Sequence, residues 1–298
     1  MAKMGKKKRK YDKGASVGFL MALPTVLGLI LLNIYPLCRT VYMSFFKSGA
    51  FGKWTFVGLD NYVTMFQSAG FWTVTKNTLL FMLLTVPVTV VLGLLIAVLL
   101  NQSINGKTVF RAIYFLPMVV APAAVAMVWK WLFNAEYGII NIVLGALHLP
   151  SKIQWISDPK TALLACAIVT IWSSVGYDAI LLLSGLQSID ASYYEAAAVD
   201  GASYWQKMFQ ITIPLVRPNL TISTILNIIY VFNSFPIIWT ITKGDPANRT
   251  DTLVTYLYKL AFYNGKQGQA AAVSVIGFLI LLFCASLYMV SVLKKGDE

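Results

Sequence analysis

The chain has 298 residues, of which 58% are hydrophobic and only 12% are Asp, Glu, Lys or Arg. A typical soluble domain is about 45–50% apolar and about 25% charged, so this composition excludes an ordinary cytosolic enzyme and a disordered chain. Its three cysteines lie far apart, in or beside apolar runs, which excludes a disulfide-stapled secreted domain. The class of protein that fits is an integral membrane protein, here with a net charge of +12.

Long uncharged stretches predict how the chain crosses the membrane, because a spanning helix needs about 20 predominantly apolar residues. The first stretch is too long for a signal-peptide core, so we expect it to be retained. Prolines inside spans can interrupt helices and open backbone toward a cavity; here they are Pro24, Pro87, Pro117, Pro122 and Pro236. The expected fold is all-α with six spans, at residues 17–37, 78–100, 112–132, 162–185, 219–241 and 270–293.

The positive charge predicts the orientation. Seven Lys and Arg residues lie within residues 1–13, directly before the first span, and such residues favour the cytoplasmic side. We therefore expect a basic cytoplasmic tail at 1–16, a transmembrane domain at 17–293, and a short cytoplasmic tail at 294–298. Beside a span, the basic run indicates contact with anionic lipid rather than nucleic acid.

The inner loop at 186–217 contains two helix signatures. Ser192, with Glu195 three residues later, predicts a capping box for a first helix. Gly201 then provides a left-handed stop.

A second helix follows within the same loop. Ser203 and Gln206 predict another capping box, and this helix is expected to end before Pro214. On pattern alone the resulting hairpin lies in the bilayer interface, folds back on its own spans, or presents a helix to another protein.

The same loop carries a motif of fixed spacing. It reads Glu-Ala-Ala, three residues, Gly, nine residues, Ile, one residue, Ile-Pro. This pattern resembles the EAA motif of ABC importer permeases, with Ile213 where Leu is usual. The matching residues, and Asp200 before the glycine, are Glu195, Ala196, Ala197, Asp200, Gly201, Ile211 and Pro214.

Other stretches are similar to the carbohydrate-type subgroup of that family, and the likeness covers about residues 17–293. They include Asp200-Gly201-Ala202, Tyr35-Pro36, Ser44-Phe45, residues 56–62, Arg111 to Pro117, and Trp131-Leu132-Phe133 with Gly138 and Asn141. The resemblance implies a type I ABC importer permease fold. It implies that the hairpin is a coupling helix in a cleft of a cytoplasmic ATPase subunit, with Glu195 facing a basic residue there.

The resemblance also implies the partners: a second homologous permease subunit, two cytoplasmic ATPase subunits and an extracytoplasmic solute-binding protein in the cell membrane. ATP and Mg are expected at the ATPase subunits, and no cofactor on this chain. Residues 101–108 end in Gly-Lys-Thr like a P-loop, but Asn101 replaces the first glycine and the segment joins two spans. We find no nucleophile–base or metal-ligand constellation and expect no catalytic site.

Polar residues inside spans four and five are candidates for the substrate path. Asp178 is an acid on a membrane helix, where such residues usually face the bundle interior or a water-filled path. Asn227, Tyr230 and Ser234 share one helical face. Hydroxyls, amides and aromatic rings suit a sugar, although polar contacts between helices are an equal alternative. By the resemblance, the candidates are Tyr177, Tyr230, Asn233, Ser234, Asn227, Ser174 and Asp178.

Together these features predict the transmembrane subunit of an ATP-driven importer for an oligosaccharide-type sugar. A permease for glycerol phosphate or another small polar solute is the alternative within the class. The mid-portions of spans four and five carry no Lys or Arg, which favours a neutral ligand. An ATP-independent transporter or channel would not need the hairpin, and pattern alone leaves it open.

Overall fold

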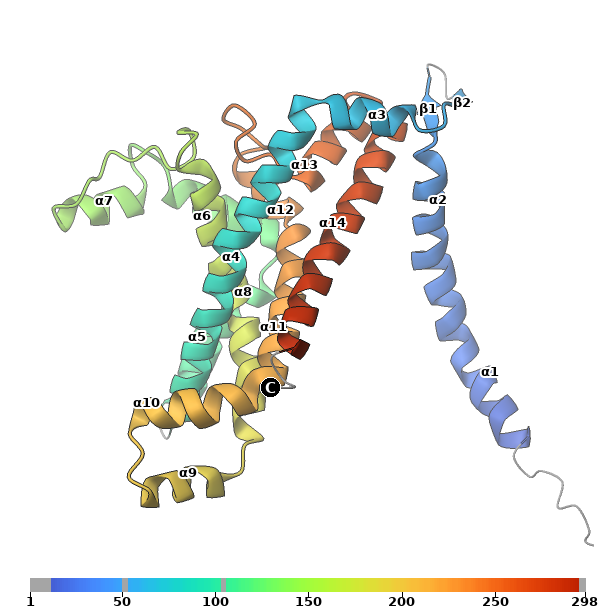
Figure 1. Cartoon of the computed structure of the whole chain (residues 1–298). Coiled ribbons are helices and arrows are strands. Elements are labelled where there is room, and N and C mark those ends of the chain that lie inside the picture. Colours follow the sequence, from blue (N-terminus) through green and yellow to red (C-terminus); the bar gives the residue numbers. More distant parts are fainter. Residues whose placement is uncertain (1–11, 50–52, 103–105, 295–298) are drawn as a thin grey trace, which may run out of the picture.

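The computed structural model describes residues 12–49, 53–102 and 106–294 (Figure 1). The helices are α1 Asp12–Leu29, α2 Tyr35–Met43, α3 Asp60–Gln67, α4 Ala69–Asn101, α5 Lys107–Val119, α6 Pro122–Leu132, α7 Ile139–Ala146, α8 Ala162–Gln187, α9 Ala191–Val199, α10 Tyr204–Lys207, α11 Ile213–Phe232, α12 Phe235–Ile241, α13 Leu253–Tyr258 and α14 Gln267–Lys294. Three π-helical segments, Ile30–Ile34, Met208–Thr212 and Lys259–Tyr263, join neighbouring helices. A short antiparallel hairpin pairs β1 Phe46–Ser48 with β2 Trp54–Phe56.

In the described part of the chain, five helices are long and apolar enough to cross a membrane, and there are six spans if a bent pair of helices is counted as one. All six predicted spans are found, with different bounds. The helical spans are Gly18–Met43, Ala69–Asn101, Val109–Val119 with Pro122–Leu132, Ala162–Gln187, Tyr204–Phe232 and Gln267–Val292. The first helix therefore includes residues 12–16, which we had assigned to the basic tail; residues 1–11 and 295–298 lie outside the described part of the chain.

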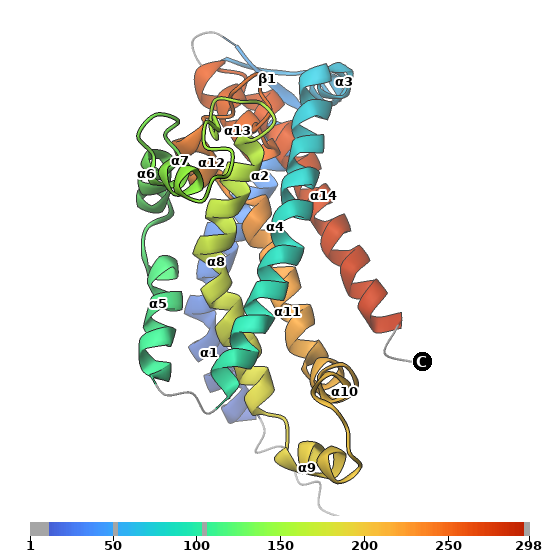
Figure 2. The ribbon, with the colours of Figure 1, turned by 90° about the vertical axis from the view of Figure 1, so that its left-hand side faces the viewer.

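Two of the predicted spans are interrupted, each beside a proline that the sequence had indicated as a possible break, Pro122 and Pro236. The third breaks at Val120–Ala121, where α5 and α6 meet at 101° (Figure 2). Val120 and Ala121 both have extended ψ angles, and at Ala121 the cause is Pro122, which disfavours the α conformation of the residue before it. The fifth breaks after Phe232, and Pro236 lies in the first turn of the new helix α12.

Helix α8 is the centre of the bundle, and α4, α5 and α11 pack against it. Small residues make these contacts close. A Cβ on Gly93 of α4 would lie only 2.7 Å from Asp178 Cβ, and a Cβ on Gly176 of α8 would overlap the Tyr114 carbonyl of α5. Such glycines let helix backbones approach in a membrane, where packing rather than the hydrophobic effect drives association.

Helices α1 and α2 stand away from the bundle (Figure 1), and α2 joins it through α14. The window of the first span has none of its residues buried. The start of α1, the end of α14 and the pair α9 and α10 all lie at the same end of the molecule. The predicted side of the membrane for the two termini stays a prediction.

Candidate functional site

A cavity of about 330 Å³ lies between the α5–α6 break, α8 and α11. It brings together five of the seven predicted substrate-path residues: Ser174, Tyr177, Asp178, Asn227 and Tyr230. The other lining residues come mainly from the break in the third span and include Pro117, Met118, Val120 and Pro122. The interrupted helix thus provides one wall of the cavity.

Asp178 is fully buried and joins two helices. Its Oδ1 accepts hydrogen bonds from Ser223 Oγ and, at 2.6 Å, from Asn227 Nδ2, both on α11. Its Oδ2 is buried and has no hydrogen-bond partner among the described residues. Oδ1 therefore joins α8 to α11, while Oδ2 is a buried acceptor that the described residues leave unsatisfied, which is costly.

Two aromatic side chains give the cavity its second chemical property. Tyr177 and Tyr230 are 42% and 40% exposed, unlike the buried Asp178 and Asn227 beside them. Their rings and hydroxyls face a space that also holds Ser174 and Asn227. The cavity therefore combines stacking surfaces with hydrogen-bonding groups, and no Lys or Arg lines it.

Asn233 and Ser234 are not among the residues that line this cavity. The reason is the break after Phe232: Asn233 is the C-cap of α11, and its Nδ2 donates to Ile229 O at 2.8 Å. Ser234, outside the helix, no longer continues the face that carries Asn227 and Tyr230. The predicted grouping of Ser234 with these two residues is wrong.

Sequence reasoning missed Ser223, the second partner of Asp178. Its position four residues before Asn227 places both on one face of α11. That spacing was a usable signal, because a buried acid needs two or more donors on a neighbouring helix.

The second predicted site is the hairpin between α8 and α11, and its first helix is α9 (Figures 1 and 2). The predicted capping box at Ser192 and Glu195 is wrong, because the N-cap is Asp190, whose carboxylate accepts from Ser192 N–H at 2.9 Å. This hydrogen bond holds the pKa of Asp190 below its usual range. Ser192 is already inside the helix.

The end of α9 agrees with the prediction. Asp200 is the C-cap, and Gly201 has φ +73°, a left-handed conformation that favours glycine. Ala202 N–H donates to Ala197 O at 2.8 Å and closes the turn. Ser203 and Gln206 form the predicted capping box of α10.

The second helix of the hairpin was predicted to end before Pro214. That prediction is wrong. The helix continues through the π-helical segment Met208–Thr212, which contains Ile211, into α11. Ile213 N–H bonds to Met208 O, one residue further back than in an α-helix. The wider turn accommodates Pro214, which has no N–H to donate. The hairpin is therefore continuous with a membrane span.

The hairpin exposes most of its surface. No residue of α9 is buried, Glu195 is exposed, and Val199 is 88% exposed. One side-chain hydrogen bond, 3.0 Å between Tyr194 Oη and Thr212 Oγ1, joins α9 to the second helix of the hairpin. Tyr193, Tyr204, Trp205 and Phe209 of the hairpin are also more than half exposed, and apolar surface exposed on this scale is typical of an interaction site.

The P-loop-like segment has the wrong structural context for a nucleotide site. Asn101 is the last residue of α4, and Gly106 precedes α5, so helices flank the segment. Residues 103–105 lie outside the described part of the chain.

Residues 89–293 match the family described as binding-protein-dependent transport system inner membrane component. The chain belongs to this family. It is a multi-pass permease of the ABC importer class, as the EAA-like hairpin indicated. The family match includes the cavity and the hairpin.

Several relatives are similar to this permease over nearly their whole length. A probable ABC transporter permease of Brucella suis is 38% identical over 91% of this chain and 94% of its own. The trehalose/maltose transport system permease MalF of Thermococcus litoralis is 33% identical over 95% of both chains. The diacetylchitobiose uptake system permease DasB of Streptomyces coelicolor is 32% identical over 96% of this permease and 89% of its own chain.

A solved structure has the same fold. It is a chain of a bacterial ABC transporter involved in the import of the acidic polysaccharide alginate. The TM-score is 0.82 with 23% identity, covering 95% of this permease and 96% of that chain. The predicted type I ABC importer permease fold, all-α with a hairpin between the fourth and fifth spans, is confirmed.

Proposed function

We propose that this permease is the transmembrane subunit of an ATP-driven importer for neutral oligosaccharides. The main support is the cavity beside the α5–α6 break, which Tyr177, Tyr230, Asn227 and Asp178 line together. Sugar hydroxyls need donors and acceptors, and sugar ring faces pack on aromatic rings. The relatives from the trehalose/maltose transport system and the diacetylchitobiose uptake system support a saccharide substrate.

The absence of basic groups from the lining argues against the glycerol phosphate alternative. A phosphate is normally bound by Arg, Lys or a row of backbone N–H groups. The lining instead contains an acid, Asp178, and no cationic side chain that could balance the charge of an anion. Asn233 and Ser234, beyond the end of α11, are left for contacts during passage and not for the cavity itself.

The coupling role rests on the continuity of the hairpin with α11. A force on α9 passes through the turn at Gly201 and along one helical rod, Tyr204–Phe232, to Asn227 and Tyr230. Movement of the hairpin by an ATPase subunit would therefore move one wall of the cavity. The coupling residues are Glu195, Ala196, Ala197, Asp200, Gly201, Ile211 and Pro214.

The proposed assembly has a second homologous permease subunit, two ATPase subunits that bind ATP and Mg, and an extracytoplasmic solute-binding protein. This chain supplies half of the pathway. A related alginate transporter structure was solved in complex with a pentasaccharide-bound periplasmic protein, which supports the last partner. The exposed apolar surface of α1 and α2 leaves room for lipid or for the second permease.

Co-purification with the ATPase subunits tests the coupling role. We expect Glu195→Lys to lower the amount of ATPase that co-purifies, because the charge reversal falls on the exposed face of α9. Glu136→Lys, an equally exposed charge reversal at the other end, is the matched control. Undiminished assembly and transport by Glu195→Lys would overturn the assignment.

Uptake measurements test the cavity. In proteoliposomes that contain all subunits, we expect Tyr230→Ala to reduce uptake of the transported sugar and sugar-stimulated ATP hydrolysis. Ile229→Ala, which changes a neighbouring residue of α11 outside the cavity, should keep both. Full activity of Tyr230→Ala, Tyr177→Ala and Asn227→Ala would refute a substrate path here.

The proposed orientation places both termini and the hairpin in the cytoplasm. Val199→Cys, in a background with exposed Cys38 changed to Ser, provides a label site on the hairpin. A membrane-impermeant maleimide should label it in inverted vesicles and not in intact cells. The reverse pattern would invert the topology.

A further inference from the structure

A second cavity, of about 560 Å³, lies at the end of the bundle opposite the hairpin. Its walls are the first turns of α4, the end of α12, the loop at 243–248, α13 and the π-helical segment after it. These parts come from distant positions in the sequence. The first cavity shares no lining residue with it.

The wall of this second cavity contains aromatic rings that are already packed together. Trp239 stacks on Phe235 with ring centroids 5.4 Å apart and lies 5.8 Å from the ring of Tyr263. Tyr263 is 68% exposed, so one face of this cluster is open. The polar part of the lining comes from exposed side chains of the loop, Lys243, Asp245 and Asn248.

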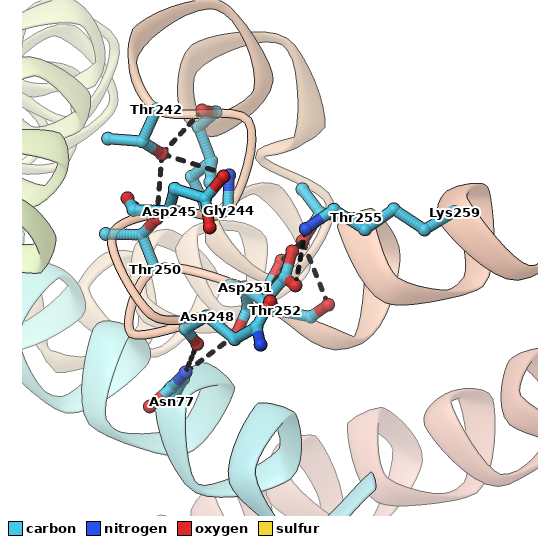
Figure 3. Close-up of polar contacts among 11 residues, drawn as sticks. Asn77, Thr242, Gly244, Asp245, Asn248, Thr250, Asp251, Thr252, Thr255 and Lys259 are labelled. Atoms are coloured by element: carbon cyan, nitrogen blue, oxygen red, sulfur yellow. Dashed lines mark hydrogen bonds and ion pairs between the residues drawn. The ribbon is translucent and has the colours of Figure 1, made fainter. Parts of the chain in front are cut away.

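A buried polar network fixes the loop on α4 (Figure 3). Asn77 of α4 donates from Nδ2 to Asn248 O at 2.8 Å and to Asp251 O at 2.9 Å. Asp251 is 2% exposed, and its carboxylate accepts from Thr255 Oγ1 and pairs with Lys259 Nζ at 2.7 Å. Such networks rigidify a segment when every member is satisfied.

The backbone of this loop is strained. Lys243, Ala247 and Asn248 have φ of 56°, 51° and 57°, values in the left-handed region, which costs a non-glycine residue about 1–2 kcal/mol. Strain of this kind persists only where surrounding contacts hold it, and it is concentrated at ligand-binding sites. The network at Asn77 and Asp251 supplies these contacts, so the cavity is formed before any ligand arrives.

The lining selects the class of ligand. Lys243 and Asp245 have opposite charge and lie two residues apart on one loop, which disfavours an anion or a cation alone. Asp251 is committed to Lys259 and Thr255 and leaves Asp245 as the one exposed carboxylate of the lining. Exposed rings beside donors and acceptors match a neutral polyhydroxyl ligand.

We propose that this cavity is a saccharide-binding vestibule, where a neutral oligosaccharide binds before it enters the cavity between α5, α6, α8 and α11. The inference rests on the proposed function. A sugar released at this end of the bundle meets Trp239 and Tyr263 first. Because ring faces are common to many hexoses, the vestibule binds with low selectivity.

Saturation-transfer NMR on the assembled importer in lipid nanodiscs, without the solute-binding protein, tests the vestibule. Maltotriose and diacetylchitobiose are the probes. We expect transfer to both sugars with the unmodified importer, and an increase of about fivefold in Kd for Tyr263→Ala from the lost stacking.

Phe262→Ala is the matched control, since this neighbouring ring is 74% exposed and does not line the cavity. Lys243→Ala removes an exposed polar group without disturbing the aromatic cluster, and should also raise Kd.

Tyr230→Ala separates this proposal from the proposed function. If the vestibule exists, Tyr230→Ala keeps the transfer signal while sugar uptake falls. If Tyr230→Ala abolishes the signal, and Tyr263→Ala and Lys243→Ala leave Kd unchanged, the vestibule is refuted and the importer assignment stands. An absence of transfer to both sugars with the unmodified importer likewise overturns the vestibule. Vestibule binding without any sugar uptake would overturn the importer assignment alone.

Discussion

The two ends of the bundle contain connecting segments that are held in opposite ways. The hairpin between α8 and α11 is held by its own caps, by Gly201 and by one side-chain bond from Tyr194 to Thr212. The segment between α12 and α14 is held by contacts with another helix, above all from Asn77, whose partner Asp251 is 174 residues away. One segment is defined locally and the other by tertiary contacts.

This difference indicates what each end has to do. The hairpin leaves its surface open, as expected of an element whose remaining contacts come from another subunit. The opposite segment has buried its polar groups and fixed a strained loop, as expected of a surface that must keep its shape. One chain thus combines an exposed segment held by local contacts with a buried segment held by tertiary contacts.

The largest expected effect is on the rigid end. In Gly244→Ala the new Cβ would overlap Asp251 Oδ1 and lie 2.7 Å from Lys259 Nζ, at a residue with φ +95°. We expect the free energy of unfolding to fall by about 3–5 kcal/mol, as when a buried ion pair is broken. Gly265→Ala is the matched control: it also has positive φ, +64°, but nothing lies within 4 Å of its Cβ. Thermal unfolding of the purified importer measures both, and equal losses would contradict the proposed network.

The second largest effect is expected when Asn77, which binds the loop from α4, is removed. Asn77→Ala leaves two carbonyl oxygens, of Asn248 and Asp251, without their donor, at about 1–3 kcal/mol for each buried group. We expect faster amide hydrogen exchange in residues 243–253 and unchanged exchange in α9. Unchanged exchange in the loop would show that Asn77 does not hold it.

A smaller effect is expected at the hairpin. Gly201→Ala places a Cβ at φ +73°, which costs about 1–2 kcal/mol from backbone strain, while its Cβ would meet no atom within 4 Å. Gly201→Asn should cost less, because asparagine tolerates this conformation. We expect lower ATP-driven uptake for Ala than for Asn, measured in proteoliposomes. Equal uptake by both variants and the unmodified permease would show that ATP-driven uptake does not depend on the left-handed turn at Gly201.

The smallest effect concerns pH. Asp190 caps α9, and the hydrogen bond from Ser192 N–H lowers its pKa. The stabilisation is complete above the unfolded pKa, about 3.9, and is lost as pH falls through the lower folded pKa. Hydrogen exchange of α9 should therefore accelerate only in acid, and in Asp190→Asn this pH dependence should disappear. The same acid dependence in Asp190→Asn would assign it to another group.

Much of the hairpin could be predicted, because its determinants are neighbours in sequence. Ser203 with Gln206 formed the predicted cap, and Gly201 the predicted turn. The errors occurred where two local rules compete: Asp190 replaced Ser192 as the cap, and a π-helical segment carried the chain past Pro214.

The cavity was predicted in its residues but not in its shape. Periodicity placed Asn227 and Tyr230 together, and the structure confirms this. The same periodicity failed for Ser234, because the helix ends after Phe232. The 101° bend before Pro122 supplied a wall that hydropathy could not foresee, since apolar residues continue on both sides of the break.

By itself, the sequence determined that this is a membrane permease with up to six spans and a helical hairpin between the fourth and the fifth. Apolar length, caps and a fixed-spacing motif are local properties, and local chemistry is enough to express them. Only the tertiary structure decided where spans break, that Asp178 binds Ser223 and Asn227, and that Asn77 holds the loop at Asp251. The physical reason is that a buried polar group takes whichever donor the packing brings near, and packing joins residues that the sequence keeps far apart.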